Sequence, residues 1–198
     1  MADTAADTSA PGTGRPQRAD ALRNRQRVLD AAVQAFSHGS ADVPLEKIAR
    51  DAGVGIGTLY RHFPTREALV EAAYRNELAR LCDSASELRA SLPADQALRA
   101  WMDRYIDYMA TKRGMADALR ALIATGANPY AQSRDRLVGA ITALLATGVE
   151  AGLVRADVTA DDVLASLLGV SLVAGEPEQR GQAARLLDLL TDGLRAHR

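Results

Sequence analysis

Apolar residues recur along this chain at the three- and four-residue spacing of α-helices, and short glycine-, proline- or polar-rich breaks separate the runs. The first run places its apolar positions on one helical face and arginines on the others; those apolar positions are Leu22, Leu29, Ala32 and Phe36. The pattern predicts a helix over residues 19–37. The preceding residues 1–17 are small, polar and interrupted by proline and glycine, so we expect a disordered tail there.

Three further helices are predicted over residues 44–52, 56–62 and about 65–88. Pro44 suits the first position of a helix, where its missing N–H costs no hydrogen bond. Pro64 disfavours helical conformation in the residue before it and therefore ends the middle helix. The hydroxyl of Thr65 can cap the helix that follows.

The remainder of the chain predicts five more helices, separated by breaks at residues 91–93, 113–114, 126–129, 152–159 and 175–177. Thr159 and Asp162 resemble a capping box, which marks a helix start. The last two helices, about 159–175 and 177–196, carry more apolar surface than one neighbour can cover. The sequence therefore predicts an all-α fold of about nine helices.

Composition agrees with a helical core and narrows the functional classes. The chain is 47% hydrophobic but only 4% aromatic, and its formal net charge of −1 argues neither for nor against nucleic acid. One cysteine, Cys82, excludes an internal disulfide, and together with three histidines it cannot form a Cys/His zinc site. We expect no metal and no cofactor. No apolar run approaches the ~20 residues of a membrane span, so we expect a cytoplasmic protein without a membrane partner.

Residues 45–63, LEKIARDAGVGIGTLYRHF, have the features of a helix-turn-helix. Gly53 can adopt the positive φ of a tight turn, and Ala49 is small where two helices approach each other. Ile48, Val54 and Leu59 supply an apolar wedge between the helices. The second helix keeps a polar outer side, which fits the major groove of duplex DNA.

The run AGVGIGTLYRHFPTREAL at residues 52–69 resembles the signature of the TetR family of bacterial regulators. The resemblance implies a helix-turn-helix DNA-binding domain at residues 18–64, with the motif itself at 44–63. It also implies a helical effector-binding and dimerisation domain at 65–198. Such a protein would bind double-stranded operator DNA as a homodimer and, as a repressor, leave it when a small effector binds.

The resemblance also assigns DNA contacts to individual residues. Groove contacts fall on Gly55, Ile56, Thr58 and Arg61. Phosphate contacts fall on Tyr60, His62 and Arg66, with Lys47 and Arg25 as flanking candidates. The same residue types have structural uses, because a tyrosine can be a core aromatic, a histidine a helix cap and an arginine a solvated charge. The family's Ser or Thr pair before the second helix is replaced here by Val43-Pro44.

In the C-terminal part, Trp101, Tyr105 and Tyr108 share one face of a predicted helix. With Met109, Met115 and Tyr130 they form either an ordinary core or a pocket for a small apolar effector. The apolar faces of the last two helices predict a dimer interface that includes Leu168, Leu172, Leu187 and Leu190.

Two other functional classes are alternatives to a ligand-responsive repressor. An enzyme has no support, because the chain lacks a Gly-x-Ser-x-Gly, a His-Glu-x-x-His and a phosphate-binding loop that follows a strand. The third class, a DNA-binding architectural protein without an effector, remains an alternative. The sequence names neither the operator, the regulated genes nor the effector.

Overall fold

The computed structural model describes residues 14–38, 42–174 and 179–196. Within these residues the chain forms nine α-helices and no β-strand, which confirms the all-α prediction. Their bounds are α1 (Gly14–His38), α2 (Leu45–Asp51), α3 (Ile56–His62), α4 (Arg66–Ser91), α5 (Ala94–Gly114), α6 (Ala116–Ala124), α7 (Ser133–Glu150), α8 (Ala160–Leu172) and α9 (Arg180–Leu194).

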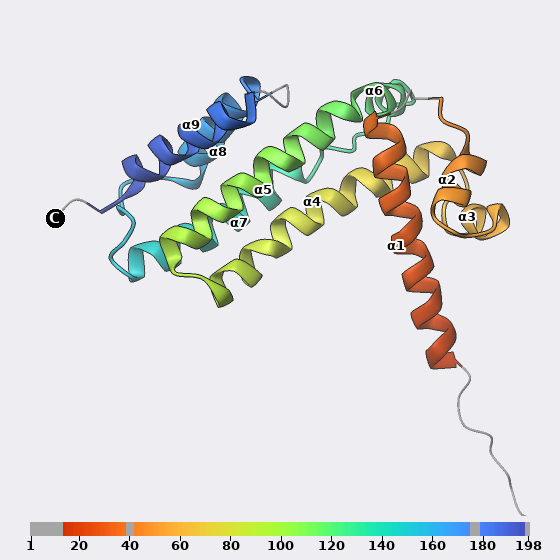
Figure 1. The fold of residues 1–198 in the computed structure, drawn as a ribbon, viewed down its shortest axis with the longest axis horizontal. Helices are drawn as coiled ribbons and strands as arrows, with labels where there is room; N and C mark the ends of the chain where they lie inside the picture. The colour runs from red at the N-terminus through yellow and green to blue at the C-terminus, as the bar shows by residue number, and fades with distance from the viewer. Residues whose placement is uncertain (1–13, 39–41, 175–178, 197–198) are drawn as a thin grey trace, which may run out of the picture.

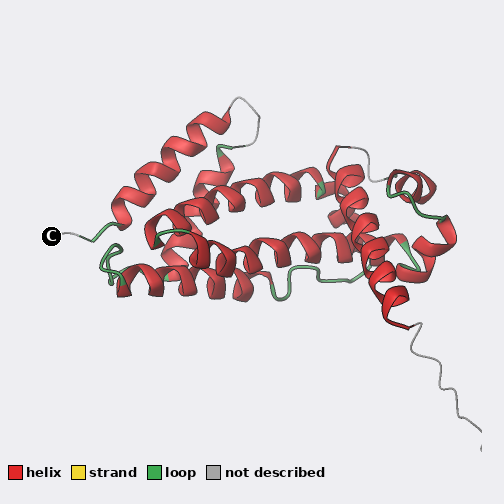
Figure 2. Ribbon diagram, turned by 60° about the horizontal axis from the view of Figure 1, so that its bottom comes forward, coloured by secondary structure: helices red, strands yellow, loops and turns green. Residues whose placement is uncertain are grey.

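The helices are arranged in an elongated body with α2 and α3 at one end and the α8–α9 pair at the other (Figure 1). Helices α4, α5 and α7 pack against one another along the middle of the body. Helix α1 crosses the end of α4 and carries α2 and α3 on its other side, while α8 and α9 cover α5 and α7 (Figure 2). Among the described helices, none is both long and apolar enough to cross a membrane.

Two helix starts are held by the side chains that the sequence indicated. The Thr65 hydroxyl accepts a hydrogen bond from the Ala68 backbone N–H at 3.1 Å. At the start of α8, the Asp162 N–H donates to the Thr159 hydroxyl at 3.2 Å and the Thr159 N–H donates to the Asp162 carboxylate at 3.0 Å. Both reciprocal bonds of a capping box are therefore present.

The beginning of α1 differs from the prediction. Residues 14–17, expected in the tail, form the first turn of α1, where Pro16 is tolerated because the first N–H groups of a helix have no acceptor within it. Leu22, expected on the apolar face, is 68% exposed, because the first half of α1 extends beyond the other helices (Figure 1). Residues 1–13 of the expected tail, and the expected helix start at 177, lie outside the described residues.

Candidate nucleic-acid interface and the core of the helical domain

Helices α2 and α3 meet at a tight turn that depends on Gly53, whose φ is +65°. The turn is closed by a hydrogen bond from the Val54 N–H to the Ala49 carbonyl at 2.9 Å. Ile48 and Leu59 are fully buried between the two helices and α1. These contacts fix the angle between α2 and α3, so the outer side of α3 is held in one orientation.

The outer side of α3 presents glycines, polar side chains and the larger side chains of Ile56 and Tyr60 to solvent. A Cβ added at Gly55 or Gly57 would have no other atom within 4 Å, so a partner can approach the backbone closely there. Tyr60 is 44% exposed, which places it at the surface rather than in the core, whereas Phe63 is buried. The residues assigned to the groove also lie here, either exposed or half-buried: Gly55, Ile56, Thr58 and Arg61.

The candidate phosphate-binding residues lie in different surroundings. Lys47 is exposed on α2 and pairs with Asp51 at 2.6 Å. The Arg25 guanidinium lies 5.3 Å from the centre of the Phe63 ring, beside the end of α3. His62 is half-buried at the same helix end.

Arg66 has a structural contact that sequence reasoning missed. Its guanidinium donates a hydrogen bond to the Val43 carbonyl and lies 5.8 Å from the centre of the Phe36 ring. The start of α4 is thereby attached to the segment before α2. Both groups that Arg66 contacts lie more than twenty residues earlier in the chain, so the residues around Arg66 in the sequence do not indicate either contact.

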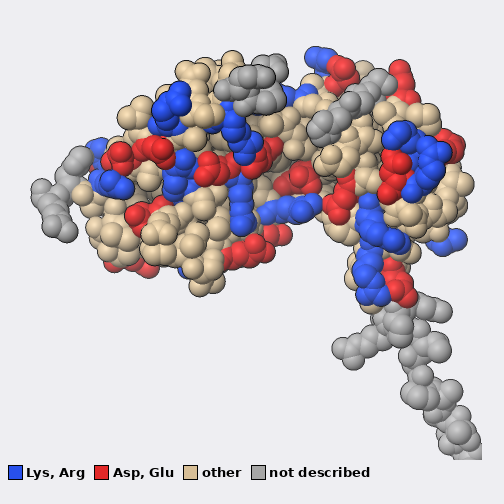
Figure 3. Space-filling view, in the orientation of Figure 1, with Lys and Arg blue, Asp and Glu red and all other residues tan. Residues whose placement is uncertain are grey.

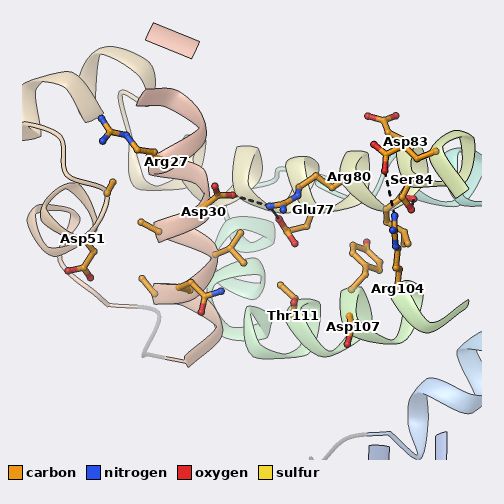
Figure 4. Close-up of a pocket in the computed structure, with 18 of the residues that line it drawn as sticks. Arg27, Asp30, Asp51, Glu77, Arg80, Asp83, Ser84, Arg104, Asp107 and Thr111 are labelled. Atoms are coloured by element: carbon orange, nitrogen blue, oxygen red, sulfur yellow. Dashed lines mark hydrogen bonds and ion pairs between the residues drawn. The ribbon is translucent and has the colours of Figure 1, made fainter. Parts of the chain in front are cut away.

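A cleft of about 1320 Å³ is lined by residues of α1, α2, α4 and α5. Across it, Arg80 of α4 pairs with Asp30 of α1 at 3.0 Å and with Glu77 at 3.5 Å (Figure 4). Arg104 of α5 pairs with Glu87 at 3.7 Å. Burial raises the pKa of the Glu77 carboxyl. Because these ion pairs are partly exposed, they contribute little to stability individually.

The aromatic residues predicted on α5 form a continuous buried cluster. Ring centres are separated by 6.0 Å between Trp101 and Tyr105 and by 6.2 Å between Tyr105 and Tyr108. The cluster continues through Tyr74 of α4 to Tyr130, at 6.3 Å and 5.3 Å. Sequence reasoning did not include Tyr74, although its spacing with Leu78 and Leu81 marks the buried face of α4.

Most polar atoms of this cluster have partners. The Trp101 indole N–H donates to the Leu81 carbonyl at 2.9 Å. The Tyr108 hydroxyl donates to the Tyr74 hydroxyl at 2.9 Å, and Tyr74 shares a further 2.9 Å hydrogen bond with Ser133. Burial and the neighbouring tyrosines raise the pKa of Tyr108.

The Tyr105 hydroxyl is the exception in the cluster. The residue is fully buried and its hydroxyl has no hydrogen-bond partner among the described residues. Burial raises the pKa of Tyr105 to about 12, so the group is a neutral donor at physiological pH. A buried donor without an acceptor is costly, and an acceptor brought by a ligand would relieve that cost.

The other candidate pocket residues lie around the same cluster. Met115 is buried, and Met109 and Tyr130 are partly buried against the core. The Lys112 ammonium lies 4.5 Å from the centre of the Tyr130 ring, and burial lowers the pKa of Lys112. Within the described residues, no three His, Cys, Asp or Glu side chains come together as a metal site.

The outer side of α8 and α9 exposes large apolar residues. Leu172 is 82% exposed and Leu168 is exposed as well. Leu187 is only 1% exposed, so it belongs to the core of its own chain and not to the predicted interface. Leu190 is half-buried. Leu189, which the predicted dimer interface did not include, is 69% exposed. Helix α9 packs against the body with the side that carries Leu187, so Leu189 faces solvent.

Two family profiles match this chain. Residues 28–73 match "Bacterial regulatory proteins, tetR family", and residues 93–196 match "Transcriptional regulator SbtR-like, C-terminal domain". The first match covers the helix-turn-helix, and the second covers α5 through α9.

Solved structures give the same result over nearly the whole chain. A TetR transcriptional regulator from Streptomyces coelicolor is 56% identical with a TM-score of 0.84, covering 88% of this chain and 99% of that chain. A TetR regulatory protein from Mycobacterium vanbaalenii is 35% identical with a TM-score of 0.76, covering 91% and 100%. A curated Staphylococcus aureus HTH-type transcriptional regulator is 24% identical over 106 residues, 52% of this chain and 57% of that protein. The chain thus matches little more than half the length of that relative.

Proposed function

The chain belongs to the TetR family of DNA-binding bacterial transcriptional regulators, and from this premise we propose that it is a repressor that a small effector releases from its operator. In this proposal a cytoplasmic homodimer places one α3 in each of two major-groove half-sites. The main support is the geometry of α3, whose outer side is open to solvent and carries Thr58 and Arg61, while Leu59 on its inner side is buried. A helix of this kind reads base edges with its exposed side chains.

Two further observations support the dimer and the effector. The exposed leucines of α8 and α9 lie at the end of the body away from α3, so pairing there leaves both reading helices free (Figure 1). The Tyr105 hydroxyl, which has no hydrogen-bond partner among the described residues, lies in a core cluster of aromatic and aliphatic side chains. A small apolar effector with one hydrogen-bond acceptor, such as a carbonyl oxygen, suits this environment.

DNA selection with the purified protein tests the operator part of the proposal. We expect a near-palindromic site, and the Arg61→Ala variant should lose preference at one position per half-site, costing about 1–3 kcal/mol. The Lys47→Ala variant is the control, because a phosphate-binding lysine contributes equally on every sequence. An Arg61→Ala protein with unchanged base preference would contradict the assignment of Arg61 as a base reader.

Ligand titration tests the effector part. A molecule that binds at the aromatic cluster should change Trp101 fluorescence and lower operator affinity together, with a coupling of about 1–3 kcal/mol. The operator should weaken binding of that molecule by the same factor, because linkage is reciprocal. If broad screening finds only ligands that leave operator affinity unchanged, the architectural alternative is favoured.

A further inference from the structure

The aromatic cluster on α5 ends at a cation, Lys112. This residue lies two helical turns beyond Tyr105 on the same face of α5, a separation of about 10 Å along the helix axis. Its ammonium lies 4.5 Å from the centre of the Tyr130 ring, which is the last ring of the cluster. Tyr105 is fully buried, whereas Tyr130 and Lys112 are half-buried. The cluster therefore reaches the protein surface at its Lys112 end.

The Lys112 ammonium has no counter-charge, since it forms no ion pair within the described part of the chain. Asp107 and Asp117, the nearest acidic residues on either side in the sequence, pair with arginines of α9 and α6. Burial lowers the pKa of Lys112. A partly desolvated cation without a counter-charge is costly, and an anion brought by a ligand would relieve that cost.

Lys112 also lies beside the contact between α5 and α1. The Ser37 hydroxyl at the end of α1 donates a hydrogen bond of 3.4 Å to the carbonyl of Thr111, the residue before Lys112. Gly114, two residues after Lys112, packs closely against the Ser37 backbone. Helix α1 in turn contacts α2 and α3. A ligand at Lys112 would therefore lie next to the contact through which α5 positions the DNA-binding end of the molecule.

We propose that Lys112 binds an anionic group of the effector, and that the effector is an apolar carboxylate whose hydrocarbon part lies along the aromatic cluster. This inference rests on the proposed effector binding and adds a charge to the apolar molecule inferred there. A carboxylate accepts a charge-assisted hydrogen bond from the ammonium, which is about twice as strong as a neutral one. The hydrocarbon part gains by leaving water for the rings. A neutral molecule of the same shape leaves the Lys112 ammonium without a counter-charge and binds more weakly.

The test compares carboxylates with the alcohols of the same carbon skeleton, in calorimetric titrations of the full chain. The set contains straight-chain and aryl-alkyl compounds of about six to twelve carbons, a length that suits the span of about 10 Å between Lys112 and Tyr105. At least one carboxylate should bind about tenfold to a hundredfold more tightly than its alcohol and should weaken operator binding. Lys112→Met should remove this preference while the alcohol still binds, and Lys112→Arg should retain most of it.

The control is Arg120→Met, which removes an exposed charge from the neighbouring α6 and should leave the carboxylate preference unchanged. Lys112→Gln replaces Lys112→Met in the comparison if the latter does not fold. A Lys112 variant that loses stability but keeps the preference would overturn the proposal, because Lys112 would then only pack against Tyr130.

The wild type alone also decides between the proposals. If no carboxylate binds more tightly than its alcohol, or if the carboxylates that bind leave operator affinity unchanged, the assignment of an anionic effector to Lys112 is wrong. Alcohols that bind and weaken operator binding would in that case still support release by a neutral effector. A wild type that binds no duplex specifically would instead contradict the proposed function.

Discussion

Tyr105 and Tyr74 show at the residue scale how different two buried tyrosines of one cluster can be. Tyr74 receives a hydrogen bond from Tyr108 and shares another with Ser133, so its hydroxyl joins α4, α5 and the start of α7. The Tyr105 hydroxyl has no such partner among the described residues. A buried hydroxyl that forms hydrogen bonds stabilises the fold, whereas a buried hydroxyl without a partner destabilises it by its lost hydration. The Tyr74 and Tyr105 hydroxyls should therefore affect stability in opposite directions.

Replacing each tyrosine by phenylalanine tests this difference. Tyr74→Phe should lower the free energy of unfolding by about 1–3 kcal/mol, because it leaves buried neighbours without partners. Tyr105→Phe should be neutral or stabilising, yet it should weaken any effector that supplies an acceptor to this hydroxyl. Urea denaturation measures both. An equal loss of stability in the two variants would show that Tyr105 has a partner such as a buried water.

At the scale of helices, the end of α5 contacts both α1, which carries the helix-turn-helix, and α8. Arg113 donates hydrogen bonds of 2.6 Å to the Ser171 and Ala174 carbonyls at the end of α8. One residue further on, a Cβ at Gly114 would lie 2.6 Å from the Ser37 carbonyl oxygen at the end of α1. Helices α1 and α8 are thus attached to the same turn of α5, and only glycine allows the contact with α1.

Gly114→Ala should therefore destabilise the protein by about 1–3 kcal/mol, the usual cost of overpacking, and displace α1. Operator affinity should fall with it, because α1 carries α2 and α3. The matched control is Gly139→Ala in α7, where an added Cβ meets nothing within 4 Å. That change should stabilise the protein by about 0.5–1 kcal/mol through helix propensity. Thermal melts and operator titrations of both variants measure the effects, and equal melting temperatures would contradict the steric argument.

The capping box at the start of α8 predicts a pH dependence. Hydrogen bonds from the Thr159 hydroxyl and backbone N–H lower the pKa of Asp162 from its ordinary 3.8. A depressed folded-state pKa stabilises the protein above the unfolded-state pKa, and this contribution is lost as the pH falls through the folded value. Asp162→Asn should lower the melting temperature at pH 7, and the difference should begin to shrink near pH 4 and disappear once the pH lies below the lowered folded-state pKa. In a Thr159→Ala background the same substitution should have a much smaller effect.

At the scale of the whole molecule, the two ends of the body have different surfaces. One end carries the exposed side of α3, and basic side chains are prominent on the described part of α1 that extends beyond the body there (Figures 1 and 3). The other end carries the exposed leucines of α8 and α9. Large exposed apolar patches mark sites of association. A two-fold axis through α8 and α9 would place two α3 helices on one molecule, as a near-palindromic operator requires.

The double variant Leu172→Glu, Leu189→Glu should therefore be a folded monomer in sedimentation experiments, because both side chains are exposed in the single chain. Its operator affinity should fall about a thousandfold or more, towards non-specific binding. Ile123→Glu on α6 is the control, since it introduces a charge at another exposed apolar position away from α8 and α9. Leu187→Glu should instead unfold the chain. A double variant that remains dimeric would contradict the proposed interface.

The sequence by itself determined the helices and the helix-turn-helix, because the signals for both are local. Within the described residues, apolar spacing, prolines and capping residues placed the helix breaks to within a few residues, and Gly53 marked the turn through a backbone requirement that only a few residues meet. The matched families and solved structures confirm the resemblance carried by residues 52–69. Hydrogen bonds within one turn and steric limits at one residue do not depend on the rest of the chain.

Only the tertiary structure decided which neighbours each helix face meets. Periodicity placed Leu22 and Leu187 on apolar faces, but the first is exposed where α1 extends beyond the body and the second is buried within its own chain. Arg66 contacts Val43 and the Phe36 ring across the fold, and the partner of Tyr108 is Tyr74, 34 residues earlier. A helical period gives the direction of a side chain relative to its own helix axis. What lies in that direction depends on how the nine described helices pack together.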